Sequence, residues 1–576
     1  MSENLNSIHS MALVFPLLLA IRLLCAQYSI IPDCDEVFNY WEPTHFLTHG
    51  YGLQTWEYSP VYAIRSWAYV GLHALIINAS QLIGIESKQT LFFILRSVLA
   101  TVSAVSEARL YATISKHYSH RVALFYVIFS ATSTGMFHAS VSYLPSSFAM
   151  YMFTFGLSHF LDKTDQRRGF VTGLAYTAFG AIFGWPFAGA MILPFGLQYV
   201  LNCLLSVGKN GSSVAQAAAR IVKTAFVSLF IVAALSVTIV PIDSIFYRKI
   251  QFVPYNIVAY NVLQTDTDTG PDIFGTEPWY YYLLNLAMNF NIVLILALAS
   301  ALLPLLSLVH SYFRLQFLSL VTLISPFFLW LAIFTLQPHK EERFMYVAYS
   351  SLCLNAALSL DAFSALAQSL ASVVGLRHFV KRRVVVVVVL VIAAVISLAR
   401  SSALAIYYGA PIEIMLNIPD QAGNVCVGRE WYRFPSSYFL HQGQRLKFVK
   451  SGFSGLLPGE FIESEDWWWN RDGTWIDPPG MNNQNLEDLS KYISVDLCNI
   501  VVDTSSPVDA SVGEILFTED SHYTPIYCTK FLNSAESTGI ARILWVPHLL
   551  HPYFKSSLSW DNYCVLQQVE AISTLG

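Results

Sequence analysis

Charged side chains are scarce in this sequence. Asp, Glu, Lys and Arg make up 12% of its 576 residues, whereas a soluble domain usually carries about 25%. Hydrophobic residues reach 55%, and the mean hydropathy is +0.48. The net charge is −5 and no long basic block is present, so nucleic acid is not expected as a partner. These shortages predict a protein whose solvent is lipid.

Metal-binding cysteine patterns are also missing. None of the 8 cysteines shows a CxxC or CxxH spacing, so zinc is not expected, and no other ligand cluster compels a divalent ion; we expect no metal and no cofactor. Cys426, Cys498, Cys528 and Cys564 lie in the polar C-terminal part. In an oxidising lumen they would form two disulfides, with three possible connectivities.

Long apolar runs are what the sequence does contain. A spanning helix needs about 20 mostly apolar residues. We predict spans at roughly 10–27, 66–85, 90–113, 122–142, 145–161, 169–202, 221–241, 284–309, 315–336, 344–373 and 384–408. The run 169–202 is long enough for two short spans, so we expect a polytopic α-helical membrane protein with about 11–12 transmembrane helices.

The C-terminal part has a different composition. Residues 409–576 contain no such apolar run and are rich in Trp, Tyr, Pro, Gly, Asn and Asp. This composition is typical of a soluble mixed α/β or β-rich domain with many turns. We therefore predict a transmembrane domain over 1–408 and a second domain over 409–576.

Basic residues give the orientation. Arg377, Lys381, Arg382 and Arg383 stand immediately before the last span, which places that loop in the cytoplasm by the positive-inside rule. The last span then leads to the lumen, so we expect the C-terminal domain to be lumenal. On the same count the polar loops 242–283 and 337–343 are lumenal, and we expect loop 28–65 to join them.

The first polar loop is acidic. Asp33, Asp35, Glu36 and Glu42 fall within eleven residues, just after the first span. Carboxylates at a bilayer surface are costly to desolvate, which favours a function. A glycosyl transfer with inversion needs a base that removes the proton of the acceptor hydroxyl. The alternative is a solvated acidic loop or a weak cation site.

Two further loops are candidates for substrate binding. His339, Lys340 and Arg343 lie at the mouth of a span, where cationic side chains can hold the oxygens of a lipid-linked phosphate; the alternative is an interfacial anchor. The loop 242–283 adds Arg248, Lys249 and aromatic residues. Aromatic faces suit carbohydrate, although an interfacial aromatic belt is the more common explanation.

One ionisable pair lies inside the apolar part. Glu107 and Arg109 stand near the end of the run 90–113. Ionisable groups within a span mark a functional site by default. A mutual structural pairing of the two side chains is an equally good interpretation.

Several motifs together resemble a known family. The stretch Asp33–Ala68, with Asp35-Glu36 and Gln54-Thr55-Trp56-Glu57-Tyr58-Ser59-Pro60, and the run His339–Phe344 are similar to the dolichyl-phosphate-mannose-dependent α-1,2-mannosyltransferases of asparagine-linked glycosylation, in glycosyltransferase family 22. Motifs after residue 425, such as Pro479-Gly480-Met481-Asn482, extend the resemblance into the C-terminal domain.

This resemblance implies a fold and a reaction. It implies a GT-C fold in the endoplasmic reticulum membrane, with an active site that faces the lumen. The implied substrates are dolichyl phosphate mannose and a dolichyl-diphosphate-linked oligosaccharide, and the implied products carry α-1,2-linked mannose, as the seventh and ninth mannoses. Alternatives are the α-1,6 or GPI-anchor mannosyltransferases of the same family, and a non-enzymatic lipid transporter or scaffold.

The residues then take expected roles. Asp35 would be the general base on the acceptor hydroxyl, and Glu36 would orient Asp35 or bind acceptor sugar. The expected donor-phosphate ligands are His339, Lys340 and Arg343, with Arg248 and Lys249 as weaker candidates. Trp41, Glu42 and Trp56 would line the sugar pocket.

Overall fold

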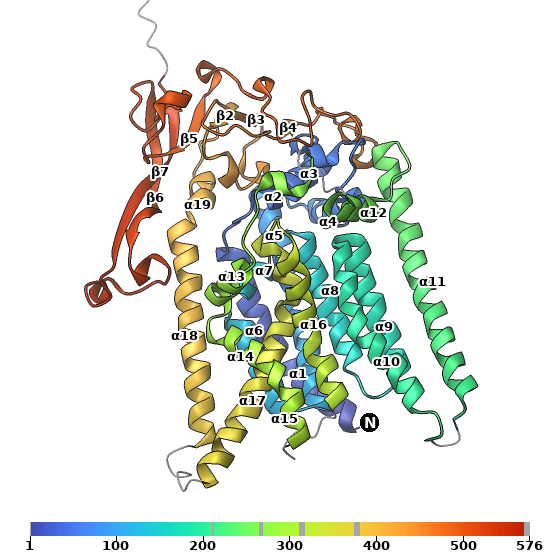
Figure 1. Ribbon diagram of the computed structural model, residues 1–576. Helices are drawn as coiled ribbons and strands as arrows, with labels where there is room; N and C mark the ends of the chain where they lie inside the picture. Colours follow the sequence, from blue (N-terminus) through green and yellow to red (C-terminus); the bar gives the residue numbers. More distant parts are fainter. Residues whose placement is uncertain (1, 210–211, 264–268, 310–316, 374–380, 570–576) are drawn as a thin grey trace, which may run out of the picture. The chain divides into compact units, whose positions relative to one another are not determined.

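A computed structural model describes residues 2–209, 212–263, 269–309, 317–373 and 381–569 (Figure 1). The chain divides into two compact units. The first comprises residues 1–26, 97–241 and 274–398, and the second comprises 27–96, 242–273 and 399–576. These two units are groups of residues that lie close in space, whereas the predicted domain boundary after residue 408 is based on composition. The boundary therefore stays a prediction.

Every predicted apolar run falls on helical structure. The long helices are α1 (Ser2–Tyr28), α4 (Trp67–Leu82), α5 (Lys88–His117), α6 (His120–Thr132), α8 (Pro145–Phe160), α9 (Gln166–Phe179), α10 (Leu193–Leu205), α11 (Val214–Tyr247), α13 (Tyr281–Phe290), α16 (Phe317–Leu336), α17 (Tyr349–Val373) and α18 (Arg382–Tyr408). Shorter helices in the first unit are α7 (Thr134–Ala139), α14 (Ile292–Ala299) and α15 (Leu303–Val309). The predicted polytopic helical fold is confirmed.

Seven helical segments in the described part of the chain are long and apolar enough to cross a membrane. They are Met11–Tyr28, Lys88–His117, Pro186–Leu205, Val214–Tyr247, Phe317–Leu336, Glu342–Val373 and Arg382–Tyr408. The pair α13 and α14–α15, bent by 119°, would make an eighth. Helices α6, α8 and α9 are shorter than this criterion requires, so the expected number of 11–12 spans stays a prediction.

The sharp bend between α13 and α14 is held by one side chain. Asn291 has a positive φ of 42°, which few residue types other than glycine and asparagine tolerate. Its amide oxygen accepts from the backbone N–H of Ile292 (2.6 Å), and its amide nitrogen donates to the hydroxyl of Ser397 (2.8 Å). The side chain therefore compensates backbone groups that the bend removes from the helical ladder.

In the second unit, short elements precede the C-terminal sheet. These are α2 (Cys34–Glu36), a π-helical turn (Val37–Trp41), α3 (Glu42–His49), β1 (Leu53–Gln54), a 3₁₀ turn (Trp56–Tyr58), α12 (Val253–Val258) and α19 (Ala410–Leu416). Strand β1 pairs antiparallel with β4 (Gly459–Glu460), with Leu53 opposite Glu460. The first polar loop is thus joined by a ladder to the C-terminal region.

The C-terminal part contains a five-stranded sheet, which agrees with the predicted mixed α/β or β-rich composition of this region. Its strands are β2 (Gly423–Val427), β3 (Gln444–Phe448), β5 (Ile500–Thr504), β6 (Tyr523–Thr538) and β7 (Ser557–Gln568), in the order β3-β2-β5-β7-β6. Strand β2 runs parallel to both β3 and β5, whereas β7 is antiparallel to β5 and β6. The core of this sheet includes Cys426, Val501, Tyr523 and Leu566.

Two disulfides cross-link this sheet. Cys426 in β2 pairs with Cys498, and Cys528 in β6 pairs with Cys564 in β7. Of the three connectivities that the sequence allows, the structure selects this one. Disulfides persist in oxidising compartments, which is consistent with the expected lumenal location of the domain.

Candidate functional site

Asp35 has the position expected of an accessible carboxylate. It lies in the short helix α2, where the side chain of Asp33 caps the helix by accepting from the N–H of Asp35 (2.9 Å). The Asp35 side chain is 32% exposed and lies 3.6 Å from the guanidinium of Arg65. The carboxylate is therefore held in place at the backbone yet is still reachable by a substrate.

Arg65 lies beside Asp35 and is not among the residues that the sequence indicated. It donates to both oxygens of Glu57 (2.9 and 2.7 Å) and to the hydroxyl of Tyr40 (2.9 Å). Burial acts to lower the pKa of Arg65, but Glu57, Tyr40 and Asp35 together raise it, so the guanidinium stays charged. It links the Gln54–Pro60 stretch to Asp35, and its position just after that stretch is the signal that would have found it.

We predict that Arg65 positions Asp35 for catalysis. Arg65→Met is expected to lower kcat on the order of 10²-fold, because a misplacement of about 1 Å in a catalytic group costs that much. Arg65→Lys keeps the charge without the two-pronged contact and should lie between parent and Arg65→Met. Initial rates at saturating donor and acceptor measure this.

Arg445→Met is the matched control. Arg445 makes the same kind of two-pronged contact with Glu463 (2.6 and 3.0 Å). It lies in β3, outside the Asp35 neighbourhood. Equal loss of kcat in both variants would show that Arg65 acts only through folding.

Glu36, Trp41, Glu42 and Trp56 lie inside the protein. The indole of Trp41 donates to Glu36 (3.1 Å) and packs on Phe92 at a ring distance of 4.2 Å. Trp56 belongs to a buried apolar cluster with Ile64 and Tyr260. Their expected contacts with sugar stay predictions, whereas their packing role is visible in the structure.

Glu42 is an anchor for the C-terminal region. Its carboxylate accepts from the backbone N–H of Ser437 (2.6 Å) and from the hydroxyls of Ser437 (2.8 Å) and Ser436 (3.1 Å). Burial raises the pKa of Glu42, and these hydrogen bonds act against that rise. Glu42 of the first polar loop and the pair Ser436-Ser437 are thus joined by a buried contact.

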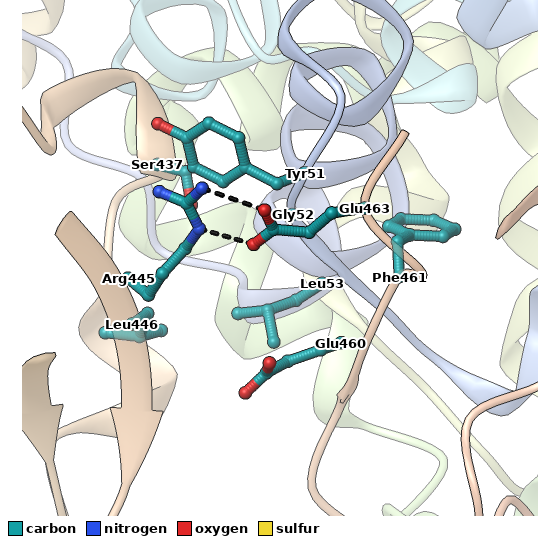
Figure 2. Close-up of a pocket in the computed structure, with 9 residues that line it drawn as sticks. All are labelled: Tyr51, Gly52, Leu53, Ser437, Arg445, Leu446, Glu460, Phe461 and Glu463. Carbon is teal, nitrogen blue, oxygen red and sulfur yellow. Dashed lines mark hydrogen bonds and ion pairs between the residues drawn. The ribbon is translucent and has the colours of Figure 1, made fainter. Parts of the chain in front are cut away.

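Figure 2 shows a small pocket beside this anchor. Its lining residues are Tyr51, Gly52, Leu53, Ser437, Arg445, Leu446, Glu460, Phe461 and Glu463. The guanidinium of Arg445 lies 3.6 Å above the ring of Tyr51 and is already paired with Glu463. None of the sequence-predicted site residues, all of which lie in the described part of the chain, is in this lining.

A possible cation site was expected as one alternative for the acidic loop. Asp33, Cys34 and Asp35 offer ligand atoms that lie within 4.8 Å of one another. Exposed acidic groups often have this spacing without an ion, so the spacing alone identifies no ligand. The expected absence of a metal stays a prediction.

Arg248 and Lys249 follow directly on the end of α11. Arg248 donates to Asn470 (2.6 Å), and its guanidinium lies 4.5 Å above the ring of Trp475. Lys249 is exposed. Neither contact assigns these two residues to a phosphate, and that role stays a prediction.

In the first unit, the run His339–Phe344 is joined to the segment that follows Phe274. The ammonium of Lys340 is nearly buried and donates to the carbonyl oxygens of Glu277 (2.7 Å) and Gln337 (2.5 Å). Arg343 forms an ion pair with Glu341 (2.5 Å). The structure therefore fastens the run His339–Phe344 to the end of the predicted loop 242–283.

His339 contributes a pH-dependent contact to this junction. The imidazole lies 2.7 Å from the carbonyl oxygen of Gly275 and 2.8 Å from the carboxylate of Glu341. Burial lowers the pKa of His339, but the hydrogen bond and charge of Glu341 outweigh it, so the pKa is raised overall. The junction therefore favours the protonated ring more than water does.

We predict that this contact stabilises the fold only on the acidic side. A raised pKa gives stability that is present below about 6.5, the pKa of free histidine, and is lost as the pH rises through the folded value. His339→Gln should therefore reduce thermal stability at about pH 6 more than at about pH 8. Thermal unfolding in detergent measures the difference in stability between the parent and His339→Gln at each pH. A difference that grows as the pH rises would contradict the assignment.

Of the two interpretations of Glu107 and Arg109, the mutual pairing is wrong, because Glu107 pairs with another arginine. Its carboxylate accepts two hydrogen bonds from Arg22 of α1 (2.9 and 2.6 Å), not from Arg109. Arg22 also donates to the carbonyl oxygen of Ser130 (2.8 Å). Arg22 is 85 residues away from Glu107, so local spacing does not reveal the pair. The pair is a buried structural contact between helices.

The chain has several apolar helices long enough to span a membrane and a C-terminal sheet that two disulfides cross-link, and sequence similarity gives its class, a membrane-embedded glycosyltransferase. Residues 13–441 match the family model "Alg9-like mannosyltransferase family". The chain belongs to this family.

Two relatives that align along almost the whole chain are α-1,2-mannosyltransferases, and a third matches a shorter part of it. Alpha-1,2-mannosyltransferase alg9 of Schizosaccharomyces pombe is 41% identical over 96% of this chain and 94% of that protein. Alpha-1,2-mannosyltransferase ALG9 of Homo sapiens is 36% identical over 97% of this chain and 88% of that protein. GPI alpha-1,2-mannosyltransferase 3 of Homo sapiens is 25% identical over 57% of this chain and 54% of that protein.

A solved structure is similar at a lower level. ArnT from Cupriavidus metallidurans bound to undecaprenyl phosphate has a TM-score of 0.47 and 14% identity, over 78% of this chain and 86% of that chain. A similarity at this level supports no conclusion about activity or substrate. The expected GT-C class follows from family membership.

Proposed function

We propose that this protein transfers mannose from dolichyl phosphate β-D-mannose to a dolichyl-diphosphate-linked oligosaccharide in the lumen of the endoplasmic reticulum, with formation of α-1,2 bonds. Family membership and two α-1,2 relatives that align along nearly the whole chain support this proposal. The observation that carries the chemistry is the Asp35 carboxylate, partly exposed and 3.6 Å from Arg65.

The proposed step is a single displacement. The acceptor 2-hydroxyl attacks the anomeric carbon of the donor mannose, the bond from that carbon to the phosphate oxygen breaks, and Asp35 takes the hydroxyl proton. Dolichyl phosphate leaves with the bonding electrons. One displacement inverts the anomeric carbon, which converts a β-linked donor into an α-linked product.

The proposed phosphate ligands are His339, Lys340 and Arg343. Cationic donors stabilise the charge that develops on a leaving phosphate. Lys340 now donates to the carbonyl oxygens of Glu277, Gln337 and Pro338, so a bound phosphate would replace one of these partners. No cofactor or metal enters this step.

The proposed sugar subsites are separate from the proposed phosphate ligands in the sequence. The expected subsites for sugar are on the second unit, at Trp41, Glu42 and Trp56. The addition of the seventh and ninth mannoses is part of the proposal and rests on the family resemblance alone. A GPI acceptor is less favoured, because the GPI relative matches only 57% of the chain. An α-1,6 specificity is less favoured, because the relatives that align along nearly the whole chain are α-1,2-mannosyltransferases.

Donor choice tests the proposal. Purified protein in liposomes is supplied with radiolabelled dolichyl phosphate mannose or with radiolabelled GDP-mannose, each with a lipid-linked oligosaccharide acceptor. We expect transfer from the lipid donor and none from the nucleotide. Transfer from the nucleotide would reject the proposed donor, and the absence of transfer from both would favour a scaffold or transporter.

A further inference from the structure

The connection between β6 and β7 is strongly apolar and exposed. Its exposed apolar side chains are Ile540, Ile543, Trp545, Leu549, Leu550, Tyr553 and Phe554. Leu549 is 84% exposed and Tyr553 is 83% exposed. Soluble surfaces rarely gather so many large apolar side chains in one place, so this loop, residues 540–554, is expected to have a partner.

The hairpin formed by β6 and β7 runs along the last part of α18. Phe531 packs on Tyr408 at a ring distance of 5.4 Å, and Trp560 packs on Tyr407 at 5.4 Å. Leu532 shares a buried cluster with Ala403. Figure 1 shows the two strands beside the upper part of this helix. The hairpin therefore follows α18 backwards from its C-terminal end.

The contact continues down to the loop itself. The backbone N–H of Trp545 donates to the carbonyl oxygen of Ala399 (2.8 Å), and Arg400 donates to the carbonyl oxygen of Ile543 (2.9 Å). A helix rises 1.5 Å per residue, so Ala399 lies roughly 13 Å along the axis from Tyr408.

This depth is inside a membrane. Helix α18 has 27 residues and passes as a candidate span, so it is roughly 40 Å long. The hydrocarbon core of a bilayer is about 30 Å thick. If the helix is centred, its C-terminal end extends about 5 Å beyond that core, and the level of Ala399 lies about 8 Å inside it.

The loop 540–554 also has backbone and side-chain features that suit a lipid environment. Backbone polar groups must be satisfied internally in lipid. The N–H groups of Leu544, Leu550 and Tyr553 donate to carbonyl oxygens within the loop, and residues 547 and 552 are prolines, which have no N–H. The rings of Trp545 and Tyr553 are of the kind that gathers at membrane interfaces.

We propose that the loop 540–554 inserts into the leaflet on the C-terminal side of α18 and anchors the C-terminal sheet to the bilayer. Its partner is lipid, not a protein or a second copy, because the loop is fastened to a helix that itself faces lipid. This anchor would fix the height of the sheet above the membrane. The inference is independent of the proposed reaction.

Spin labels test the insertion. Nitroxides are attached at Leu549→Cys and Tyr553→Cys in the full-length protein in nanodiscs, and at Ser511→Cys, an exposed polar position of the same domain, as the control. A Cys34→Ser parent without added cysteines gives the background, because the other free cysteines are buried. Power saturation compares collisions with oxygen and with a water-soluble nickel chelate.

The proposal makes a definite prediction. Labels at 549 and 553 should collide preferentially with oxygen, and their nickel accessibility should be several-fold lower than at 511. Nickel accessibility equal to that at 511 would overturn the insertion. Low accessibility to both reagents, with an immobilised label, would overturn it as well, because protein would then cover the loop.

Discussion

Asp35→Asn is expected to lower the rate of mannose transfer by about 10²–10⁴-fold, the usual contribution of a positioned general base. Asparagine has nearly the same size as aspartate and can still contact Arg65, but it cannot accept the hydroxyl proton. The backbone hydrogen bond to Asp33 involves only the N–H of residue 35, so α2 should keep its position. Transfer assays with purified protein measure the rate, and thermal unfolding shows that the fold is intact.

Asp33→Asn is the matched control for this prediction. Asp33 is also an acidic residue of the first loop, and its main visible role is to cap α2. Asparagine caps helices about as well as aspartate, so Asp33→Asn should keep most of the activity. Near-normal transfer by Asp35→Asn would remove the base assignment. An equal loss in both variants would show that acidity of the loop, not a base at Asp35, matters.

Arg22→Met is expected to destabilise the protein by about 3–5 kcal/mol, which is typical when one partner of a buried ion pair is removed. Arg22 and Glu107 are both almost fully buried, and two hydrogen bonds join them. Ser103 and Ser130 also donate to Glu107. Without Arg22 the Glu107 carboxylate would remain buried without its counter-charge. Unfolding in mixed micelles measures the loss.

The double variant Arg22→Met with Glu107→Met separates charge from packing. If the cost of the single variant comes from an unpaired charge, the double variant should recover much of the lost stability, because an apolar pair of similar volume can replace a buried ion pair. Additive losses in the two single variants would instead show that the ion pair itself contributes little.

The helical part of this fold was predictable because its signal is local. Eleven apolar runs were expected, and each overlaps helical structure. What the runs could not show is where a helix bends. The run 284–309 reads as one span, but Asn291 divides it into two helices at 119°. A bend of this kind depends on the contact between Asn291 and Ser397, which lie more than a hundred positions apart.

The sequence indicated candidate residues for the site but not the contacts that these residues make. The first loop indicated Asp35 through its acidic composition and its family motif. Arg65 lies within the family-like stretch Asp33–Ala68, but its contacts with Glu57 and Tyr40, which hold it beside Asp35, are visible only in the folded structure. Likewise, Glu42 seemed suited to a sugar pocket, whereas the fold places Ser436 and Ser437 around it. Glu42 and these serines are almost four hundred residues apart, so their contact cannot be inferred from residue spacing in the sequence.

One measurement tests the central claim most directly. Purified protein is incubated with dolichyl phosphate mannose and a defined lipid-linked oligosaccharide, and the product is digested with a mannosidase specific for α-1,2 bonds, with Asp35→Asn beside the parent. The account predicts that the parent adds a mannose that this enzyme removes, and that the variant adds almost none. A product that resists the mannosidase, or folded protein that transfers no mannose at all, would contradict the account.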